Sequence, residues 1–144
     1  MLRSVFKNLF RTGVLCALTL PLSAESPKPN GPLGPEAFDR LTVGKTITFS
    51  QNGQPYGAEE YFENRRVRWS RLDGNCVNGE WYPQGDQICF IYEHRNDPQC
   101  WSAYEERGVL LVVPDALPLT SDRVLTELKQ STNPLHCLGP DVGA

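Results

Sequence analysis

The chain has 144 residues, with 14 Lys and Arg against 17 Asp and Glu, five Cys, and 12 each of Gly and Pro. This length allows one domain and excludes a large doubly wound or barrel enzyme, which needs roughly 200 residues or more. The net charge of −3 excludes a nucleic-acid-binding protein that works through bulk positive charge.

Residues 1–24 have the layout of a secretory signal peptide. Basic residues and no acidic ones stand at the start, and a short apolar run over 13–22 follows. This run is too short for a membrane anchor, which needs about 20 apolar residues. Small residues at Ser23 and Ala24 place the cleavage site at or close to Ala24. The pattern predicts export, either to the periplasm or out of the cell.

The mature chain is more acidic than the whole sequence. Removing the signal peptide takes away three basic residues and leaves 11 against 17 acidic ones, so the net charge falls to −6. Such a charge disfavours nucleic acid and anionic lipid as partners. No second apolar stretch approaches membrane length, and the run over 109–113 is typical of a buried strand. We therefore expect a soluble monomer without stable membrane insertion.

Short strands separated by turns follow a leader that is rich in Pro and Gly. Residues 25–37 contain four Pro and two Gly, which predicts a flexible leader before a single domain over 38–138. Turn signals such as Asn52-Gly53 and Asn78-Gly79 recur. The expected strands cover 45–50, 59–62, 66–72, 80–82, 87–93, 99–105 and 109–113. This rhythm predicts a mainly β fold, an antiparallel meander that forms a small barrel or a curved sheet.

The last part of the chain has a helical pattern. Ser121 can cap a helix, and Leu125 and Leu128 follow at helical spacing. We therefore predict one short C-terminal helix near 121–130, packed against the sheet. The end of the chain is rich in Gly and Pro, so we expect a disordered tail over 139–144.

The mature chain keeps an even number of cysteines, because Cys16 falls in the signal peptide. An even number in a small exported domain predicts two disulfides, and four Cys allow three connectivities. The four are Cys76, Cys89, Cys100 and Cys137.

One connectivity follows from the register of the hairpin that the fifth and sixth expected strands form. If its midpoint lies directly after His94, Cys89 faces Cys100 at a distance close to the one that a disulfide needs. Cys76 then pairs with Cys137 by elimination. That second bond would staple the C-terminal part of the chain onto the sheet.

No motif for catalysis, metal binding or cofactor binding stands out. There is no CxxC, HExxH, GxSxG, P-loop or dinucleotide fingerprint, and His94 and His136 are expected at the surface. Acidic residues occur in consecutive pairs such as Glu59-Glu60. Because neighbours in a strand face opposite ways, we interpret these pairs as solvated charge rather than acid–base dyads. We predict no catalytic residue, no metal and no cofactor.

Basic and aromatic residues supply the candidate binding site. Four Arg fall within seven positions, and in a strand Arg66 and Arg68 share one face. This face is either a solvated one paired with acidic residues of adjacent strands, or a site for an anion or an acidic partner. The candidates Trp69, Trp81 and Trp101 either fill the core or line the mouth of a small-ligand cavity.

A spaced pattern runs through the middle of the chain: Gly79-x-Trp81, then Gly85-Asp86-x-Ile88-Cys89-Phe90, then Cys100-Trp101. The pattern resembles that of a group of small exported alphaproteobacterial proteins of unknown function. The resemblance covers residues 56–101, under half of the mature chain. It implies an exported protein with a β-rich fold, and it implies no activity and no catalytic residue.

These observations favour a non-catalytic periplasmic or secreted binding protein. Its partner would be an envelope protein or a small anionic or apolar ligand. One alternative is an enzyme of an unrecognised class, which should bring a His or a carboxylate with a perturbed pKa into the main cleft. A second alternative is a structural envelope protein, which should have no pocket. A binding protein should instead have an apolar pocket or an exposed patch of Arg and aromatic residues.

Overall fold

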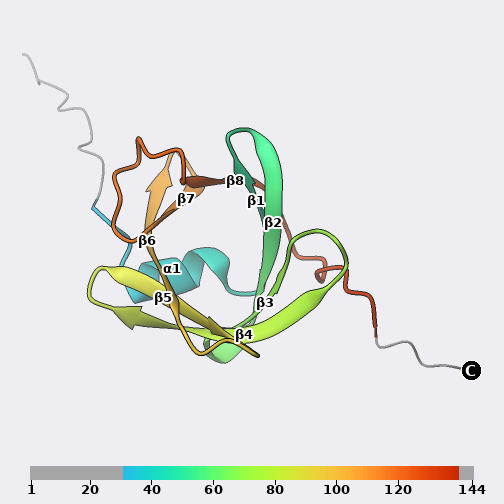
Figure 1. Cartoon of the computed structure of the whole chain (residues 1–144). Coiled ribbons are helices and arrows are strands. Elements are labelled where there is room, and N and C mark those ends of the chain that lie inside the picture. Colours follow the sequence, from blue (N-terminus) through green and yellow to red (C-terminus); the bar gives the residue numbers. More distant parts are fainter. Residues whose placement is uncertain (1–30, 140–144) are drawn as a thin grey trace, which may run out of the picture.

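The computed structural model describes residues 31–139, which form a closed barrel of eight antiparallel strands (Figure 1). Each strand pairs with the next along the chain, and β8 pairs with β1 to close the barrel. The strands are β1 Thr46–Gln51, β2 Gln54–Tyr61, β3 Arg66–Ser70, β4 Cys76–Gln84, β5 Gln87–Tyr92, β6 Gln99–Glu106, β7 Val109–Pro114 and β8 Leu125–Ser131. The predicted antiparallel β fold is confirmed, and the meander closes into a barrel rather than an open sheet.

The alternation of side chains along each strand places one face of the sheet inside the barrel. In β1 and β2 the inward side chains of Ile47, Phe49 and Tyr61 are at most 3% exposed. The other strands add to the same core the side chains of Val67, Trp81, Ile88, Phe90, Ala103, Leu110, Val112 and Leu125. Removing this apolar surface from water is the main force that holds the barrel together.

Tight turns connect neighbouring strands where the sequence supplies residues that tolerate a positive φ. Asn52 and Gly53 join β1 to β2 with φ of 50° and 77°, the left-handed conformations that a type I′ turn requires. The turn predicted at Asn78-Gly79 is wrong, because both residues lie within β4. Gly79 serves a close approach instead: a Cβ there would stand 2.5 Å from the carbonyl oxygen of Ile91.

The one α-helix among residues 31–139, α1 Pro35–Thr42, closes one end of the barrel (Figure 1). Its Phe38 side chain is 1% exposed and meets Trp81 and Tyr61 edge to face, with ring centroids 5.2 and 5.7 Å apart. The Thr42 hydroxyl donates to the Phe38 carbonyl within the helix. A proline in the first turn suits a helix start, because its missing N–H would have no partner there anyway.

The predicted flexible leader over 25–37 is wrong for the residues that the structure describes. Leu33 donates its backbone N–H to the Ala103 carbonyl at 2.7 Å, and α1 begins at Pro35. The high Pro and Gly content predicted a flexible segment. Residues 33–37 are ordered instead because the next residues of α1 bury the aromatic side chain of Phe38 in the barrel. Residues 25–30, the signal peptide predicted over 1–24 and the tail beyond residue 139 lie outside the described residues.

The predicted C-terminal helix near 121–130 is also wrong, because this part of the chain contains the last strand, β8. Leu125 points into the barrel and is 4% exposed, whereas Leu128 is 52% exposed. Without β8, strands β1 and β7 would each present an unpaired edge. Pairing with β1 and β7 therefore makes this segment a strand, although its apolar residues are spaced as in a helix.

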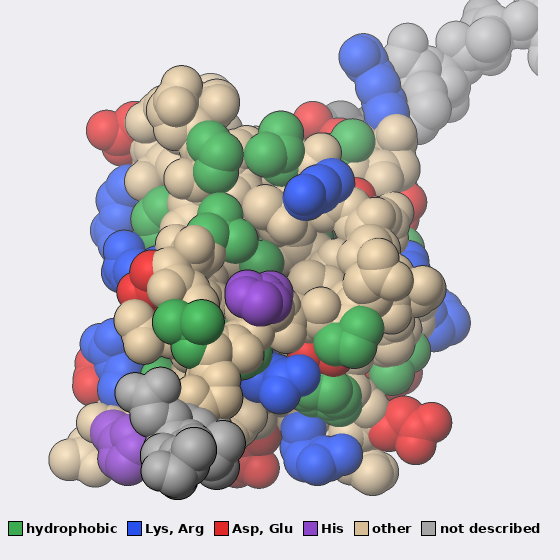
Figure 2. All heavy atoms as spheres, turned by 90° about the vertical axis from the view of Figure 1, so that its right-hand side faces the viewer, with side chains coloured by type: hydrophobic (Ala, Val, Ile, Leu, Met, Phe, Trp, Pro, Cys, Tyr) green, Lys and Arg blue, Asp and Glu red, His purple; other side chains and the backbone are tan. Residues whose placement is uncertain are grey.

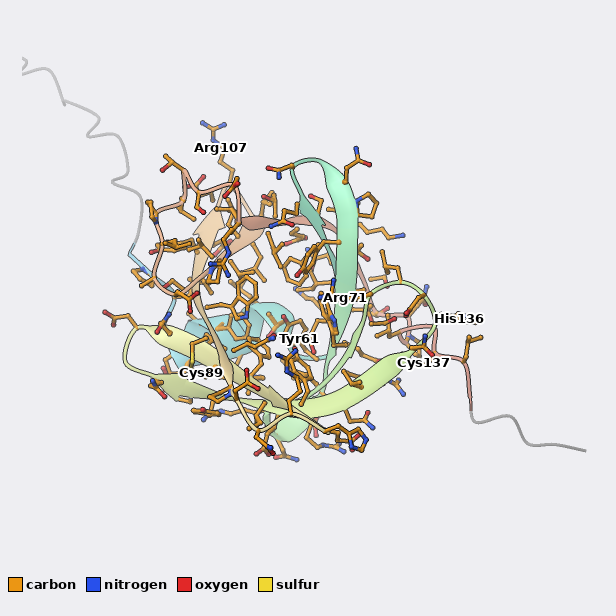
Figure 3. The ribbon with its side chains drawn as sticks, in the orientation of Figure 1. Tyr61, Arg71, Cys89, Arg107, His136 and Cys137 are labelled. Atoms are coloured by element: carbon orange, nitrogen blue, oxygen red, sulfur yellow. A yellow bond between two sulfur atoms is a disulfide. The ribbon has the colours of Figure 1, made fainter. Side chains whose placement is uncertain are left out.

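Both predicted disulfides are present. Cys89 and Cys100 face each other across β5 and β6 with Cα atoms 3.9 Å apart, in the register that was predicted for this hairpin. Cys76 and Cys137 form the second bond, with Cα atoms 5.7 Å apart. Figure 3 labels Cys89 and Cys137 on opposite sides of the barrel.

The second disulfide fixes a C-terminal segment, residues 132–139, to the outside of the barrel. In this segment the backbone N–H of Leu135 donates to Glu60 Oε2 at 3.0 Å. The backbone N–H of Leu138 donates to the Gly74 carbonyl at 2.8 Å. The segment therefore lies outside the barrel beside β2 and the loop that joins β3 to β4 (Figure 1).

Candidate functional site

The barrel holds a cavity that opens at the end opposite α1. Its volume is about 660 Å³, within the range of about 300–1,000 Å³ that is typical of small-molecule sites. The mouth is formed by the loops that follow β3, β5 and β7, and no residue of α1 lines the cavity. The helix thus closes one end of the barrel, while the loops leave the other end accessible.

Aromatic side chains form much of the cavity wall. The lining includes Phe49, Tyr56, Tyr61, Trp69, Phe90, Tyr92 and Trp101. The rings of Phe90 and Tyr92 are nearly parallel, with centroids 6.3 Å apart, and the ring of Trp69 lies 6.0 Å from that of Tyr56. Trp69 fits against the barrel wall because Gly57 on β2 has no side chain: a Cβ there would collide with the indole ring.

Glu59 is the one carboxylic acid among the described residues that lies buried in the cavity wall. It sits near the C-terminal end of β2, between Ile47 of β1 and Trp69 of β3, and is 3% exposed. The Tyr92 hydroxyl donates a hydrogen bond of 2.7 Å to Glu59 Oε2. Within residues 31–139, Glu59 Oε1 has no hydrogen-bond partner. A buried polar atom without a partner is costly, so this oxygen is available to a ligand.

Burial raises the pKa of Glu59 from 4.5 to about 8, and the hydrogen bond from Tyr92 opposes this rise only in part. At pH 7 the carboxyl group is therefore mostly neutral. Burial also raises the pKa values of Tyr61 and Tyr92 well above 10, and the negative charge of ionised Glu59 adds to both shifts. The cavity interior is thus uncharged at neutral pH, with one group that can ionise.

Charged side chains gather at the mouth of the cavity instead. Arg95 pairs with Asp97 at 3.6 Å, and Arg123 pairs with Asp115 at 3.5 Å. The Arg71 guanidinium lies over the Tyr56 ring, 5.4 Å from its centroid, and Figure 3 places Arg71 at the edge of the barrel opening. These ion pairs are exposed and contribute little to stability.

The structure divides the five candidate binding residues among three places. Trp69 and Trp101 line the cavity, as one of the two interpretations of the tryptophans predicted. Trp81 is 2% exposed and belongs to the core beside α1. Arg66 and Arg68 lie on the outside of the barrel, because they alternate along β3 with the inward-facing residues.

The outward arginines are engaged with neighbours of the kind that the solvated-face interpretation predicted. Arg68 contacts Glu60 Oε2 at 2.7 Å, and Glu60 also accepts the Leu135 N–H of the C-terminal segment. The guanidinium groups of Arg66 and Arg68 both lie over the Phe62 ring, 5.7 and 5.4 Å from its centroid. Arg66 pairs in register with Glu80 on β4.

The outer face beside the C-terminal segment carries a mixed surface. Figure 2 shows its hydrophobic side chains dispersed among polar side chains and charges of both signs. Among the described residues, the large hydrophobic side chains that are exposed are Leu72, Leu128 and Leu138. This face has no broad apolar patch of the kind that marks a stable protein interface.

Sequence reasoning missed Glu59, which was interpreted as solvated charge together with Glu60. The two residues face opposite sides of β2: Glu60 contacts Arg68 outside, and Glu59 lines the cavity. A signal was present in the alternation of Gly57, Glu59 and Tyr61, which puts the acid on the same face as a buried aromatic residue.

The fold and the cavity define a small disulfide-bonded barrel with a ligand-sized cavity. No protein-family model, curated protein or solved structure matches the chain significantly. The resemblance to exported alphaproteobacterial proteins therefore stays a prediction. Among residues 31–139 there is no cluster of three metal-ligating side chains. No helix in this part of the chain is long and apolar enough to cross a membrane.

Proposed function

We propose that the protein is a non-catalytic, exported binding protein that takes a small, largely apolar ligand into the barrel. The observation that carries this proposal is the cavity of about 660 Å³, open at one end and walled by aromatic side chains. Of the two kinds of partner predicted, a small ligand is favoured over an envelope protein, because the described residues form a ligand-sized cavity and expose few large hydrophobic side chains, namely Leu72, Leu128 and Leu138.

The rigidity of the barrel supports this function. Helix α1 fills the closed end, and the two disulfides tie β5 to β6 and the C-terminal segment to β4. A cavity that is formed before binding loses little conformational entropy when the ligand arrives. Disulfides persist in oxidising compartments, which supports export to the periplasm or the medium.

One observation favours a second candidate, an enzyme of an unrecognised class. Glu59 is a carboxyl group with a pKa raised to about 8 in the main cavity, the feature expected of a general acid or base. The two candidates differ in the fate of the ligand. A binding protein returns its ligand unchanged after prolonged incubation, whereas an enzyme yields a product that mass spectrometry detects.

The binding proposal is tested with 1-naphthalenemethanol, a neutral aromatic probe small enough for the cavity. We expect isothermal titration calorimetry to give a Kd below about 1 mM. Val77 lines the cavity opposite Trp69, so Val77→Trp should fill the space and weaken binding by at least about tenfold. Leu128 is exposed and outside the cavity lining, so Leu128→Trp should leave the affinity unchanged.

The control for folding is the far-UV circular dichroism spectrum of both variants. Equal affinities of the Val77→Trp variant and the wild type would place the probe outside the cavity and contradict the proposal. The absence of any measurable heat with the wild-type protein would contradict it as well.

A further inference from the structure

We propose that the cavity selects a small organic cation, an ammonium group on an aromatic or apolar body, and that Glu59 is its counter-ion. This inference rests on the proposed function and names the substrate class of the same site. The ligand keeps the apolar character that was predicted from the sequence. Its charged group is positive, whereas the sequence analysis expected an anionic or an apolar ligand.

The geometry of the Glu59 carboxyl group is the first observation. One oxygen, Oε2, accepts the Tyr92 hydroxyl at 2.7 Å, which fixes the orientation of the group. The other oxygen, Oε1, has no partner among the described residues, although Glu59 is buried and lines the cavity. A ligand that donates a hydrogen bond to Oε1 would satisfy this atom, and an ammonium N–H is such a donor.

The aromatic surroundings of Glu59 are the second observation. Tyr61 lies two residues further along β2, Trp69 on β3 pairs with Glu59, and Tyr92 contacts Glu59 from β5. The negative faces of aromatic rings attract cations, and cages of such rings bind ammonium groups. A carboxylate beside several rings therefore offers both charge and polarisable surface to the same cation.

The distribution of charge in the cavity is the third observation. From the elements around Glu59, the titratable groups facing it are Tyr61 on β2 and Tyr92 on β5, and β1 contributes the apolar Ile47. The basic residues of the lining are Arg71, His94, Arg95 and Arg123, all exposed residues in the loops at the mouth. Among the residues that the structure describes, a bound anion would thus find no basic side chain in the cavity interior, whereas a cation would find the acid Glu59.

Binding a cation must displace the proton of Glu59. At pH 7 most of the free protein carries a neutral carboxyl group, because burial raises the pKa of Glu59 to about 8. When an ammonium ion binds, the carboxyl O–H bond breaks, the electron pair stays on Glu59 as a carboxylate, and the proton passes to solvent. Close to one proton should therefore be released per cation bound at pH 7. The affinity should rise about tenfold per pH unit up to pH 8 and then level off.

The experiment compares three naphthalene probes of one shape on the disulfide-bonded protein: 1-naphthylmethylammonium, 1-naphthalenemethanol and 1-naphthoate. Isothermal titration calorimetry at pH 7 in phosphate and in Tris gives the affinity, and the difference in heat between buffers gives the proton release. We expect the ammonium probe to bind about tenfold to hundredfold more tightly than the alcohol, and the carboxylate to bind least.

Glu59→Gln tests the counter-ion directly, and Glu80→Gln is the matched control on the outside of the barrel. The Glu59→Gln variant should lose both the preference for the ammonium probe over the alcohol and the proton release. Glu80 is exposed on β4 outside the cavity lining, so Glu80→Gln should behave as the wild type.

The outcomes separate this inference from the proposed function. If the alcohol or the carboxylate binds as tightly as the ammonium probe, or if no proton is released, the cation inference is overturned and the binding function stands. If the Glu59→Gln variant keeps the preference for the ammonium probe, Glu59 is not the counter-ion. If none of the three probes binds to the wild type, the proposed function and the inference both fail.

Discussion

The protein is expected to become easier to unfold as the pH rises from about 4.5 to about 8. In the unfolded chain the Glu59 carboxyl ionises near its ordinary pKa of 4.5, whereas burial raises the pKa of Glu59 to about 8 in the folded protein. Between these values the folded state holds a proton that the unfolded state has released, so stability falls with rising pH. The full loss is about 5 kcal/mol, on the order of half of the stability of a small domain.

Urea unfolding at pH values from 4 to 9, with the disulfides intact, measures this effect. Glu59→Gln removes the ionisable group, so most of the fall in the free energy of unfolding across this range should disappear. Above pH 8 the variant should be more stable than the wild type. Glu80→Gln, on the outer face, should retain the wild-type pH dependence. If the wild type and the Glu59→Gln variant show equal slopes, Glu59 is not buried as described.

Removing the disulfide between Cys76 and Cys137 should cost more stability than removing the one between Cys89 and Cys100. The two bonds close loops with sequence separations of 61 and 11 residues. The entropy of the unfolded chain that each bond removes grows with loop length, which gives about 4 kcal/mol for the first bond and about 3 kcal/mol for the second. Without the first bond, the C-terminal segment is held by weaker contacts, such as the hydrogen bond that the Leu135 N–H donates to Glu60.

The measurement is urea unfolding of the two double variants, Cys76→Ala/Cys137→Ala and Cys89→Ala/Cys100→Ala, beside the wild type. Alanine is chosen because Cys89 is fully buried, where a serine hydroxyl would need a partner. If the Cys89→Ala/Cys100→Ala variant proves the less stable of the two, the loop-length account of the disulfides is wrong.

The barrel wall could be predicted from the sequence because its signals are local. Hairpins such as the one that pairs Cys89 with Cys100 depend on residues near each other in the chain, so alternation and turn residues are sufficient to set the register. The pairing of Cys76 with Cys137 followed by elimination once the hairpin was placed. Closure of the meander into a barrel depends on the pairing of β8 with β1. These two strands are far apart in the sequence, so local signals do not predict their pairing.

The two wrong elements, the flexible leader and the C-terminal helix, are both decided by distant contacts. Phe38 is buried because its ring packs against Tyr61, Trp81 and Phe90. These residues are far from Phe38 in the sequence, so local patterns could not predict the contact. Leu125 and Leu128 are spaced as in a helix, but the open edges of β1 and β7 require a strand there. In both cases tertiary structure overrides local propensity.

The candidate site could be predicted only in part, since two of its tryptophans were named and its carboxylic acid was not. Trp69 and Trp101 line the cavity, in agreement with the interpretation that the tryptophans surround a small-ligand cavity. An acidic residue is normally solvated, so composition alone argues against a buried Glu59. Burial of an acid against that tendency is the kind of local conflict that occurs at functional sites.

The most direct test of a buried carboxyl group in the ligand cavity is the pH titration of the Glu59 side-chain carbon by ¹³C NMR. The Glu59 signal is assigned by its absence from the spectrum of the Glu59→Gln variant. A midpoint near pH 8 is the predicted result, since burial raises the pKa of this group to about 8. A midpoint near 4.5, the ordinary pKa of a glutamate, would mean that Glu59 is solvated, and it would contradict the account of the cavity.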